Sequence, residues 1–363
     1  MHVLVVTVVH NPSDARIRYR QIRALLEAGH QVTYLAPFER FGQPLPQDEG
    51  IENLTGFSIS RAEGRKRLGA LREARAAVAM HAPGKDIVLM HDPELVLAVA
   101  RLKDLPPVVW DVHEDTAATM TLKPWLPKPA RPAGVRLAQF IERYAEQHYH
   151  LILADDGYRE LFEHEHPVVR NTTYVPEQVP EPGDERVVYV GHLTRARGTE
   201  EMIEVGRLLK GKVRVELIGD ADDQMKPLVQ QAHDEGSVVW HGFMPNKQAL
   251  ELVQGSLAGL SLRHDEANYR NSWATKVIEY MAHGVPWVST PTPPAPELAE
   301  KFEAGIVTPF DDPKAAADAI LKLRDDAELR VTMARRGHDA ALTDYNWRVD
   351  QKAFVEQLEA WAR

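Results

Sequence analysis

The sequence contains no cysteine among its 363 residues. Disulfide bridges, thiolate metal sites and cysteine nucleophiles are therefore excluded. The sequence also lacks an apolar run long enough to span a membrane. Its first ten residues, MHVLVVTVVH, are apolar but lack the basic leader of a signal peptide. We interpret this stretch as a first buried strand and expect a cytoplasmic protein.

Positive charge is in deficit, and the formal net charge is −10. The first 172 residues hold 21 basic and 22 acidic side chains, so the acidic excess lies in the second half. An acidic protein is a poor general binder of nucleic acid, and we expect no such partner. The first half nevertheless contains a basic cluster that suits a phosphate-bearing acceptor or an anionic membrane surface. Its members are Arg61, Arg65, Lys66, Arg67, Arg72 and Arg75.

Short apolar runs alternate with amphipathic segments of helical length, which is the pattern of parallel α/β sheets. The expected strands of the first half are Val3–Val9, Gln31–Ala36, Asp86–Met90, Val108–Val112 and Leu151–Ala154. The expected helices there are Asp14–Ala28, Arg65–His81, Pro93–Lys103 and Gly134–His148. A second series of strands follows at Val187–Val190, Val213–Ile218, Ser237–Trp240, Leu257–Leu262 and Pro286–Ser289. The sequence therefore predicts two doubly wound domains.

The stretch TYVPEQVPEPGDER, residues 173–186, contains three prolines and little apolar content, so we interpret it as a linker. It separates a first domain, 1–172, from a second, 187–345. Residues 346–363 contain an amphipathic helix. The ends of the expected strands are polar in both halves, as in His91–Asp92. Because ligands bind beyond the carboxyl ends of such strands, we expect a site in a cleft between the domains.

One segment, RHDEANYRNSWATKVIEYMAHGVP, holds the most informative pattern. A helix is expected from about Thr275, with Asn271 or Ser272 as its N-cap, ending before Gly284. Lys276, Glu279 and His283 share one face of that helix. Its N-terminus suits a phosphate, and a carboxylate one turn further in can accept hydrogen bonds from a ribose diol. The alternative interpretation is a solvated charged face.

The run K-x-x-E-Y-M-A-x-G-x-P in this segment resembles the donor-nucleotide motif of retaining glycosyltransferases of family four, which have the GT-B fold. In that family two glutamates flank seven residues, and the second binds the donor ribose. Glu279 matches the second glutamate, whereas Asn271 stands where the first would be. VVYVGHLTRARGTEEM, residues 187–202, is similar to the family pattern G-R-L-x-x-x-K-G, with Arg197 in place of the lysine and His192 in place of the arginine.

The resemblance extends into the first half. VVWDVHEDTAATMTLKPWLP, residues 108–127, is similar to a bacterial surface-polysaccharide branch of the family. His113 matches the family histidine that approaches the donor sugar. The glycine-rich first loop of the wider family is replaced here by HNPSDAR, which begins at His10. Asp92 either belongs to the polar strand ends or caps a helix that starts at Pro93.

The resemblance implies a GT-B enzyme whose last helix crosses back to the first domain. It implies retaining, metal-independent transfer from a nucleotide-diphosphate sugar, most simply a UDP-sugar, to a cell-surface glycan or lipid-linked acceptor. No cofactor is expected beyond this donor, and His113 is the catalytic candidate. The implied donor-binding residues are Gly191, His192, Arg197, Arg263, Asn271, Ser272, Thr275, Lys276 and Glu279.

Three further interpretations remain open. A UDP-sugar 2-epimerase has the same fold, and a two-domain sugar-binding protein is an alternative without catalysis. The basic residues at 61–75 and the stretch Lys123-Pro-Trp-Leu-Pro-Lys suit peripheral contact with the inner face of an anionic membrane. Solvated surface charge explains the same residues equally well.

Overall fold

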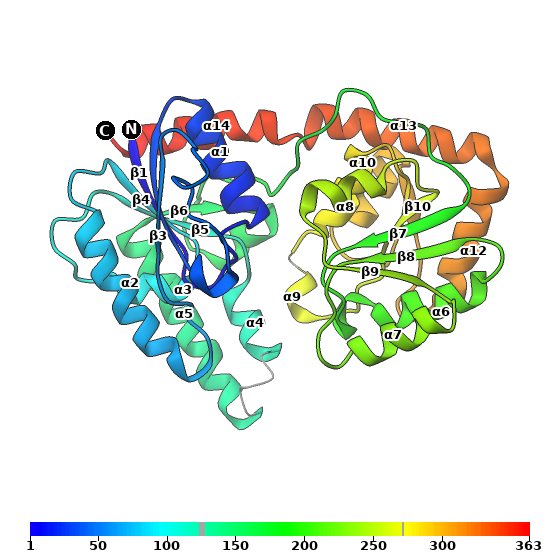
Figure 1. The fold of residues 1–363 in the computed structure, drawn as a ribbon, viewed down its shortest axis with the longest axis horizontal. Coiled ribbons are helices and arrows are strands. Elements are labelled where there is room, and N and C mark those ends of the chain that lie inside the picture. Colours follow the sequence, from blue (N-terminus) through cyan, green and yellow to red (C-terminus); the bar gives the residue numbers. More distant parts are fainter. Residues whose placement is uncertain (123–127, 271) are drawn as a thin grey trace. The chain divides into compact units, whose positions relative to one another are not determined.

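The computed structural model describes residues 1–122, 128–270 and 272–363. The chain forms two compact units, one of Met1–Asn171 with Arg348–Arg363 and one of Thr172–Trp347 (Figure 1). Each unit is built on its own six-stranded parallel sheet. We refer to them as the first unit and the second unit.

The sheet of the first unit has the strand order β3-β2-β1-β4-β5-β6. The order reverses at β1, which pairs with both β2 and β4, and ligands of open α/β sheets bind beyond the carboxyl ends of the strands at such a point. Its central strands are apolar on both faces because helices cover both. The strands are β1 His2–Val6, β2 Gln31–Ala36, β3 Leu54–Ser58, β4 Ile87–Met90, β5 Val108–Val112 and β6 His150–Leu153.

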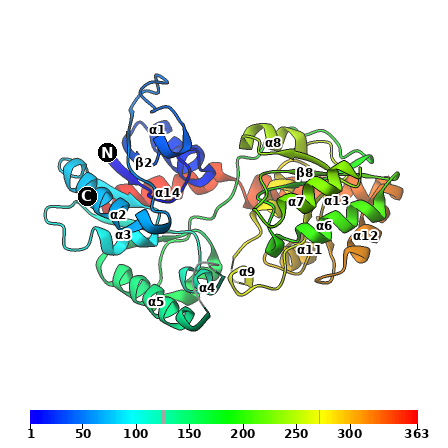
Figure 2. The same cartoon turned by 60° about the horizontal axis from the view of Figure 1, so that its bottom comes forward.

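The first helical segment of this unit differs from its prediction. The expected α-helix Asp14–Ala28 is a π-helical stretch, Ala15–Ile22, that continues as α1 Arg23–Glu27. Asp14 caps it by accepting the backbone N–H groups of Arg16 and Ile17. The expected helix from Pro93 ends early, at Ala98. The other helices are α2 Arg67–His81, α3 Pro93–Ala98, α4 Thr116–Leu122 and α5 Arg131–His148, with α4 packed along α5 (Figure 2).

The last helix, α14 Trp347–Trp361, belongs to the first unit from Arg348 onward. The Nε2 atom of His30 lies 3.0 Å from the carboxylate of Glu359. The rings of His150 and Trp361 stack with their centroids 4.5 Å apart. The C-terminal residues therefore pack on the N-terminal sheet although more than 170 residues of the second unit intervene.

The sheet of the second unit has the order β12-β11-β10-β7-β8-β9, and its order reverses at β7. Its strands are β7 Arg186–Val190, β8 Arg214–Ile218, β9 Val239–Gly242, β10 Ala258–Ser261, β11 Trp287–Ser289 and β12 Gly305–Val307. Its helices are α6 Thr199–Leu209, α7 Lys226–Asp234, α8 Asn246–Val253, α9 Ala267–Arg270, α10 Thr275–Ala282, α11 Ala295–Phe302, α12 Pro313–Asp325 and α13 Ala327–Asp344. The prediction of two doubly wound parallel sheets is confirmed.

Residues 173–186, which we interpreted as a linker, pack on the second unit. The Nε2 atom of His338 lies 2.8 Å from the carbonyl oxygen of Pro176. Arg330 is buried and donates to the carbonyl oxygen of Pro182 at 3.3 Å. The chain crosses from the first unit to the second at Asn171–Thr172 and returns at Trp347–Arg348. The predicted cleft between the domains stays a prediction.

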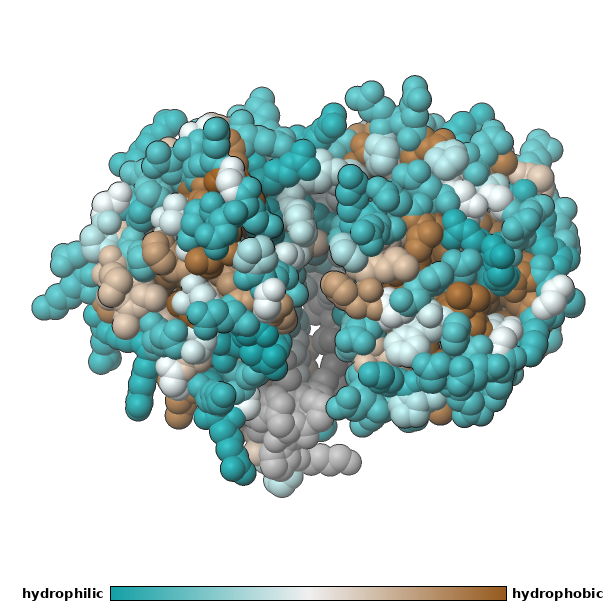
Figure 3. Space-filling model, viewed as in Figure 1, coloured by the Kyte–Doolittle hydropathy of each residue, from teal (hydrophilic) through white to brown (hydrophobic). Residues whose placement is uncertain are grey.

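Polar and charged side chains cover most of the face seen in Figure 3, with apolar side chains scattered among them. Large apolar side chains that are exposed include Leu68 on α2 and Leu137 and Phe140 on α5. In the part of the chain that the structure describes, every helix is either too short or too polar to cross a bilayer.

Candidate functional site

Helix α10 begins at Thr275, as predicted, but its N-cap is Ala274. The prediction of Ser272 as the cap is wrong, and Asn271 lies outside the described residues. Alanine has no side-chain acceptor for the first N–H groups of a helix, so the positive end of the α10 dipole is not satisfied by the cap residue. The start of α10 therefore retains the character of an anion site.

The ammonium of Lys276 lies 2.9 Å from Oε2 of Glu279, one turn further along α10. Glu279 is only 4% exposed, and His283 is also buried, with its Nδ1 2.8 Å from the carbonyl oxygen of Glu279. The alternative interpretation of this helix face as solvated charge is therefore wrong for Glu279 and His283. A buried carboxylate is costly unless cations and donors compensate it, which makes Glu279 a candidate binding group.

Gly191, directly after β7, brings that strand end against α10. Its φ of +153° is unusual for a residue with a side chain. A Cβ atom at this position would lie 2.9 Å from the hydroxyl of Tyr189 and 3.3 Å from Cε of Lys276. The absence of a side chain therefore lets Lys276 lie across the end of β7. His192 is exposed, and its carbonyl oxygen accepts a hydrogen bond from Tyr189 at 3.0 Å.

Gly198 makes a second close approach. A Cβ atom there would lie 1.8 Å from the carbonyl oxygen of Leu262, so any side chain would force the two segments apart. The backbone N–H of His264 donates to the carbonyl oxygen of Ala196 at 3.0 Å. These contacts place the turn after β7 beside the loop after β10. The guanidinium groups of Arg197 and Arg263 consequently come from adjacent strand ends.

A tyrosine that the sequence analysis did not single out lies between these two arginines. Tyr269 hydrogen-bonds Arg197, and the guanidinium of Arg263 lies over the Tyr269 ring, 4.6 Å from its centroid. Arg263 also donates to the carbonyl oxygen of Ser272 at 3.4 Å. Tyr269 lies in α9, Ala267–Arg270, a single helical turn that is too short to show periodicity in the sequence.

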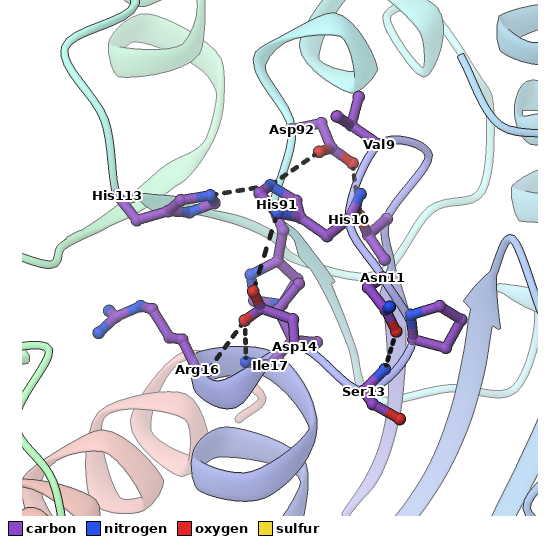
Figure 4. A network of polar contacts seen from close by, with 12 residues as sticks. Val9, His10, Asn11, Ser13, Asp14, Arg16, Ile17, His91, Asp92 and His113 are labelled. Atoms are coloured by element: carbon purple, nitrogen blue, oxygen red, sulfur yellow. Dashed lines mark hydrogen bonds and ion pairs between the residues drawn. The ribbon is translucent and has the colours of Figure 1, made fainter. Parts of the chain in front are cut away.

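The first unit has a separate polar network at the ends of β1, β4 and β5 (Figure 4). Asp111 on β5 is fully buried and accepts two hydrogen bonds from Arg16, at 2.6 and 2.7 Å. Burial would raise the pKa of Asp111, but Arg16 holds it well below its usual range. His91 lies 3.2 Å from the same carboxylate. Asp111 is therefore a structural anchor for the strand ends.

His113 directly follows β5 and is partly buried. Its Nδ1 lies 3.1 Å from the carbonyl oxygen of Asp111, and its Nε2 lies 3.0 Å from Nε2 of His10. Asp92 is the N-cap residue of α3, as one interpretation expected, but its side chain makes no cap hydrogen bond. Its carboxylate instead accepts hydrogen bonds from Thr7 and Val8 and lies 3.2 Å from His10. The sequence indicated a polar loop beginning at His10, but it did not indicate that His10 contacts Asp92 and His113.

Two groups of possible metal ligands occur among the described residues. In the first, His91, Asp111 and His113, the Asp111 oxygens already receive the guanidinium of Arg16, with which a cation would have to compete. The second combines Glu201, His264 and Asp311 in the second unit. The His264 ring is paired with Glu201 at 3.0 Å, whereas Asp311 is largely exposed. Neither arrangement resembles a closed site with four converging ligands.

The comparisons with known proteins concern the same regions. Residues 171–339 match the family model described as Glycosyl transferases group 1. The amylovoran biosynthesis glycosyltransferase AmsK of Erwinia amylovora is 25% identical over 196 residues, covering 49% of this chain and 45% of AmsK. The chain thus spans about half the length of the curated relatives that it matches.

Two solved structures match almost the whole chain. HepE of Anabaena, in complex with UDP and glucose, has a TM-score of 0.76 and 16% identity, with coverage of 99% and 100%. Sucrose-phosphate synthase of Thermosynechococcus elongatus has a TM-score of 0.76 and 15% identity, with coverage of 99% and 98%. This likeness confirms the predicted GT-B fold. The roles of the individual site residues stay predictions.

Proposed function

Residues 171–339 belong to the glycosyl transferases group 1 family, and from that membership we propose that the protein is a retaining glycosyltransferase. It transfers a sugar from a nucleotide-diphosphate sugar, most simply a UDP-sugar, to a growing cell-surface glycan or its lipid-linked precursor. Support for the donor is that HepE was solved with UDP-glucose. Support for the acceptor is that AmsK is named for the biosynthesis of a polysaccharide, amylovoran.

The observation that carries this proposal is the buried Lys276–Glu279 pair against Gly191. Glu279 offers carboxylate oxygens to the ribose hydroxyls, which are donors that a carboxylate accepts well. Lys276 and the start of α10 lie one turn away and suit the diphosphate. Gly191 leaves the space beside Lys276 free of a side chain. Ribose and diphosphate are adjacent in a nucleotide sugar, as are these groups along α10.

The chemistry consists of one substitution at the anomeric carbon. The bond between this carbon and the diphosphate oxygen breaks, and a bond to the acceptor hydroxyl oxygen forms on the same face of the sugar. The hydroxyl proton passes to the departing phosphate oxygen. Arg197, Arg263 and Lys276 stabilise the negative charge that develops on the diphosphate. His113 positions the donor sugar, and no protein side chain is assigned as nucleophile.

The test is a screen of nucleotide sugars for thermal stabilisation, followed by an assay of nucleoside diphosphate release with and without glycan acceptors. We expect stabilisation by UDP and one UDP-sugar, and release that depends on acceptor. A 2-epimerase would instead convert the sugar without needing an acceptor, and a binding protein would release nothing. Absence of binding to any nucleoside diphosphate would contradict the proposal.

We further propose peripheral contact with an anionic membrane through the start of α2. Arg65, Leu68 and Arg72 are exposed and spaced so that they share one face, and Leu68 is 72% exposed. An apolar side chain between cations suits the interface of an anionic bilayer. Lys66 is also exposed, whereas three of the predicted cations contact neighbouring groups: Arg61 with Val9 and Glu63, Arg67 with Glu94, and Arg75 with Ala98 and Ala100. Lys123, Trp125 and Leu126 lie outside the described residues.

Co-sedimentation with vesicles of phosphatidylglycerol and phosphatidylethanolamine tests this surface. Binding at low salt should weaken at high salt, because the Debye length shortens. Replacing Arg65 and Arg72 by Glu should abolish binding, whereas Arg195→Glu in the second unit, which reverses an equally exposed charge, should not. If the wild type fails to bind at low salt, the membrane proposal is wrong.

A further inference from the structure

His10 lies four residues beyond the carboxyl end of β1, the strand at which the strand order of the first sheet reverses. Its Nε2 lies 3.2 Å from Oδ1 of Asp92 and 3.0 Å from Nε2 of His113 (Figure 4). The His10 and His113 rings meet edge to face, with centroids 4.8 Å apart. One imidazole is thus placed between a buried carboxylate and a second imidazole, and the three side chains come from three different strand ends.

The contacts of Asp92 stabilise its ionised form. It is 1% exposed, and its Oδ2 accepts the Thr7 hydroxyl at 2.8 Å and the Val8 backbone N–H at 2.6 Å. These donors and the neighbouring His10 lower the pKa of Asp92 although burial acts in the opposite direction. The remaining oxygen, Oδ1, faces His10. A carboxylate with these fixed partners holds the His10 ring in one orientation.

The same carboxylate determines the charge of His10. Burial lowers the pKa of His10, but attraction by Asp92 outweighs it and raises the pKa to about 9. Asp14 and Glu114 act in the same direction from the start of the first helix and the end of β5. Arg16 and His91 face Asp111, the neighbour of this network on β5. At neutral pH His10 is therefore an imidazolium that donates through Nε2.

The contacts of His113 define its protonation state. The carbonyl oxygen of Asp111 only accepts hydrogen bonds, so the nearby Nδ1 of His113 carries a hydrogen. The single Nε2–H of His10 lies within reach of two acceptors, Oδ1 of Asp92 at 3.2 Å and Nε2 of His113 at 3.0 Å, and is shared between them. In this arrangement Nε2 of His113 is the acceptor. A second proton on His113 would place two N–H groups head to head.

We propose that His10, held by Asp92, is the residue that positions His113 and fixes it as the neutral Nδ1–H tautomer. This inference rests on the proposed function, in which His113 positions the donor sugar. The loop HNPSDAR replaces a glycine-rich loop, and its first residue is His10. In this proposal His10 orients the ring of His113, the residue after β5 that positions the donor sugar. His10 acts through His113 and is not assigned a contact with substrate.

Three variants test the proposal: His10→Ala, which removes the donor, His10→Gln, whose amide N–H reaches the position of Nε2, and His164→Ala as an exposed control. The ¹⁵N shifts of the imidazole of His113, which distinguish its tautomers, are measured at pH 7, together with kcat/KM for transfer and the affinity for UDP. Circular dichroism verifies the fold of each variant. The glutamine variant keeps the experiment informative if the alanine variant unfolds.

At pH 7 we expect His113 of the wild type to be a single Nδ1–H tautomer, and His113 of His10→Ala to be a mixture of the Nδ1–H and Nε2–H tautomers. In that variant kcat/KM should fall at least tenfold. His10→Gln should recover part of the loss, and affinity for UDP should not change. The His164→Ala control should match the wild type in every measurement.

Identical tautomers of His113 in wild type and His10→Ala would overturn the proposal. So would equal kcat/KM values in the presence of altered tautomers, because His10 would then position a ring that transfer does not need. A wild type that neither binds UDP nor transfers sugar contradicts the proposed function instead. The ¹⁵N measurement still decides in that case whether His10 controls His113.

Discussion

The ammonium of Lys276 and the buried carboxylate of Glu279 form an ion pair at 2.9 Å within one turn of α10. The pair keeps Glu279 compensated, and Lys276, which is 22% exposed, is able to leave it for an anionic ligand. A ligand that contains both a diphosphate and a ribose diol can offer the diphosphate to Lys276 and the ribose hydroxyls to Glu279. The ion pair therefore fits the proposal that α10 binds a nucleotide.

Lys276→Met should lower stability because it leaves a nearly buried carboxylate without its cation. Breaking a buried pair on one side costs about 3–5 kcal/mol, and partial exposure of Lys276 reduces this to roughly 1–3 kcal/mol. Urea denaturation at pH 7 measures the difference. Lys314→Met is the control, because its pair with Asp318 is exposed and should contribute little to stability. Equal effects of the two substitutions would contradict the role of Glu279 as a buried charge.

Asp111→Asn should destabilise the first unit, since it leaves the buried guanidinium of Arg16 without its carboxylate. The expected loss is about 3–5 kcal/mol. Because the pKa of Asp111 is lowered in the folded state, its stabilisation is present above the pKa of the unfolded chain and disappears as acid titrates the folded carboxylate. Denaturation at pH 7 and pH 3 therefore should show a smaller difference between variant and wild type at pH 3. A constant difference would contradict this assignment.

We predict the opposite pH dependence of stability for Glu142 on α5. It is buried beside a cavity of about 380 Å³ that Asp115 also lines. Burial and the charge of Asp115 raise the pKa of Glu142 to about 7. The folded state therefore binds the proton more tightly, and stability falls as pH rises from the ordinary carboxyl pKa of 4.5 through about 7. Glu142→Gln should then stabilise the protein at pH 8 by roughly 1–3 kcal/mol and have little effect at pH 4. Thermal melts at both pH values, with Glu160→Gln as a control, decide the matter.

Transfer should not require a divalent metal, because Arg197, Arg263, Lys276 and the α10 dipole neutralise the diphosphate. Assays in EDTA should retain most of the activity measured without it. Complete loss, with recovery on adding Mg²⁺ or Mn²⁺, would show that a metal supplies this neutralisation. The group of Glu201, His264 and Asp311 would then be the first place to examine.

Much of the fold could be predicted because parallel strands are apolar runs with helices between them. Gln31–Ala36 and Val108–Val112 have their predicted bounds. Strands β3 and β12 were missed, since β3 contains Gly56 and alternates exposed with buried residues, and β12 has only three residues. Both lie at sheet edges, where the apolar pattern is weakest.

The site was only partly predictable. The motif on α10 indicated Lys276 and Glu279, yet no local pattern shows that Glu279 is buried. The partners of His113 come from positions far apart in the sequence, such as His10, and are brought together by the strand order. Such contacts depend on the topology of the sheet and have no spacing that a sequence displays. Tyr269 was not predicted as a site residue, because its contact with Arg197 also depends on the topology of the sheet.

Calorimetric titration of UDP into the wild type and Glu279→Ala tests the central claim most directly. Alanine favours the helix, and Lys276 is near enough to solvent to be hydrated in the variant. Hydrogen bonds from ribose hydroxyls to a charged acceptor contribute roughly 1.5–3 kcal/mol each. The account predicts that UDP binds about 10- to 1,000-fold more weakly to Glu279→Ala, with an unchanged circular dichroism spectrum. Glu300→Ala, an exposed substitution on α11, should bind UDP as the wild type does. Equal affinities of wild type and Glu279→Ala for UDP, with matching spectra, would contradict the assignment of α10 as the nucleotide site.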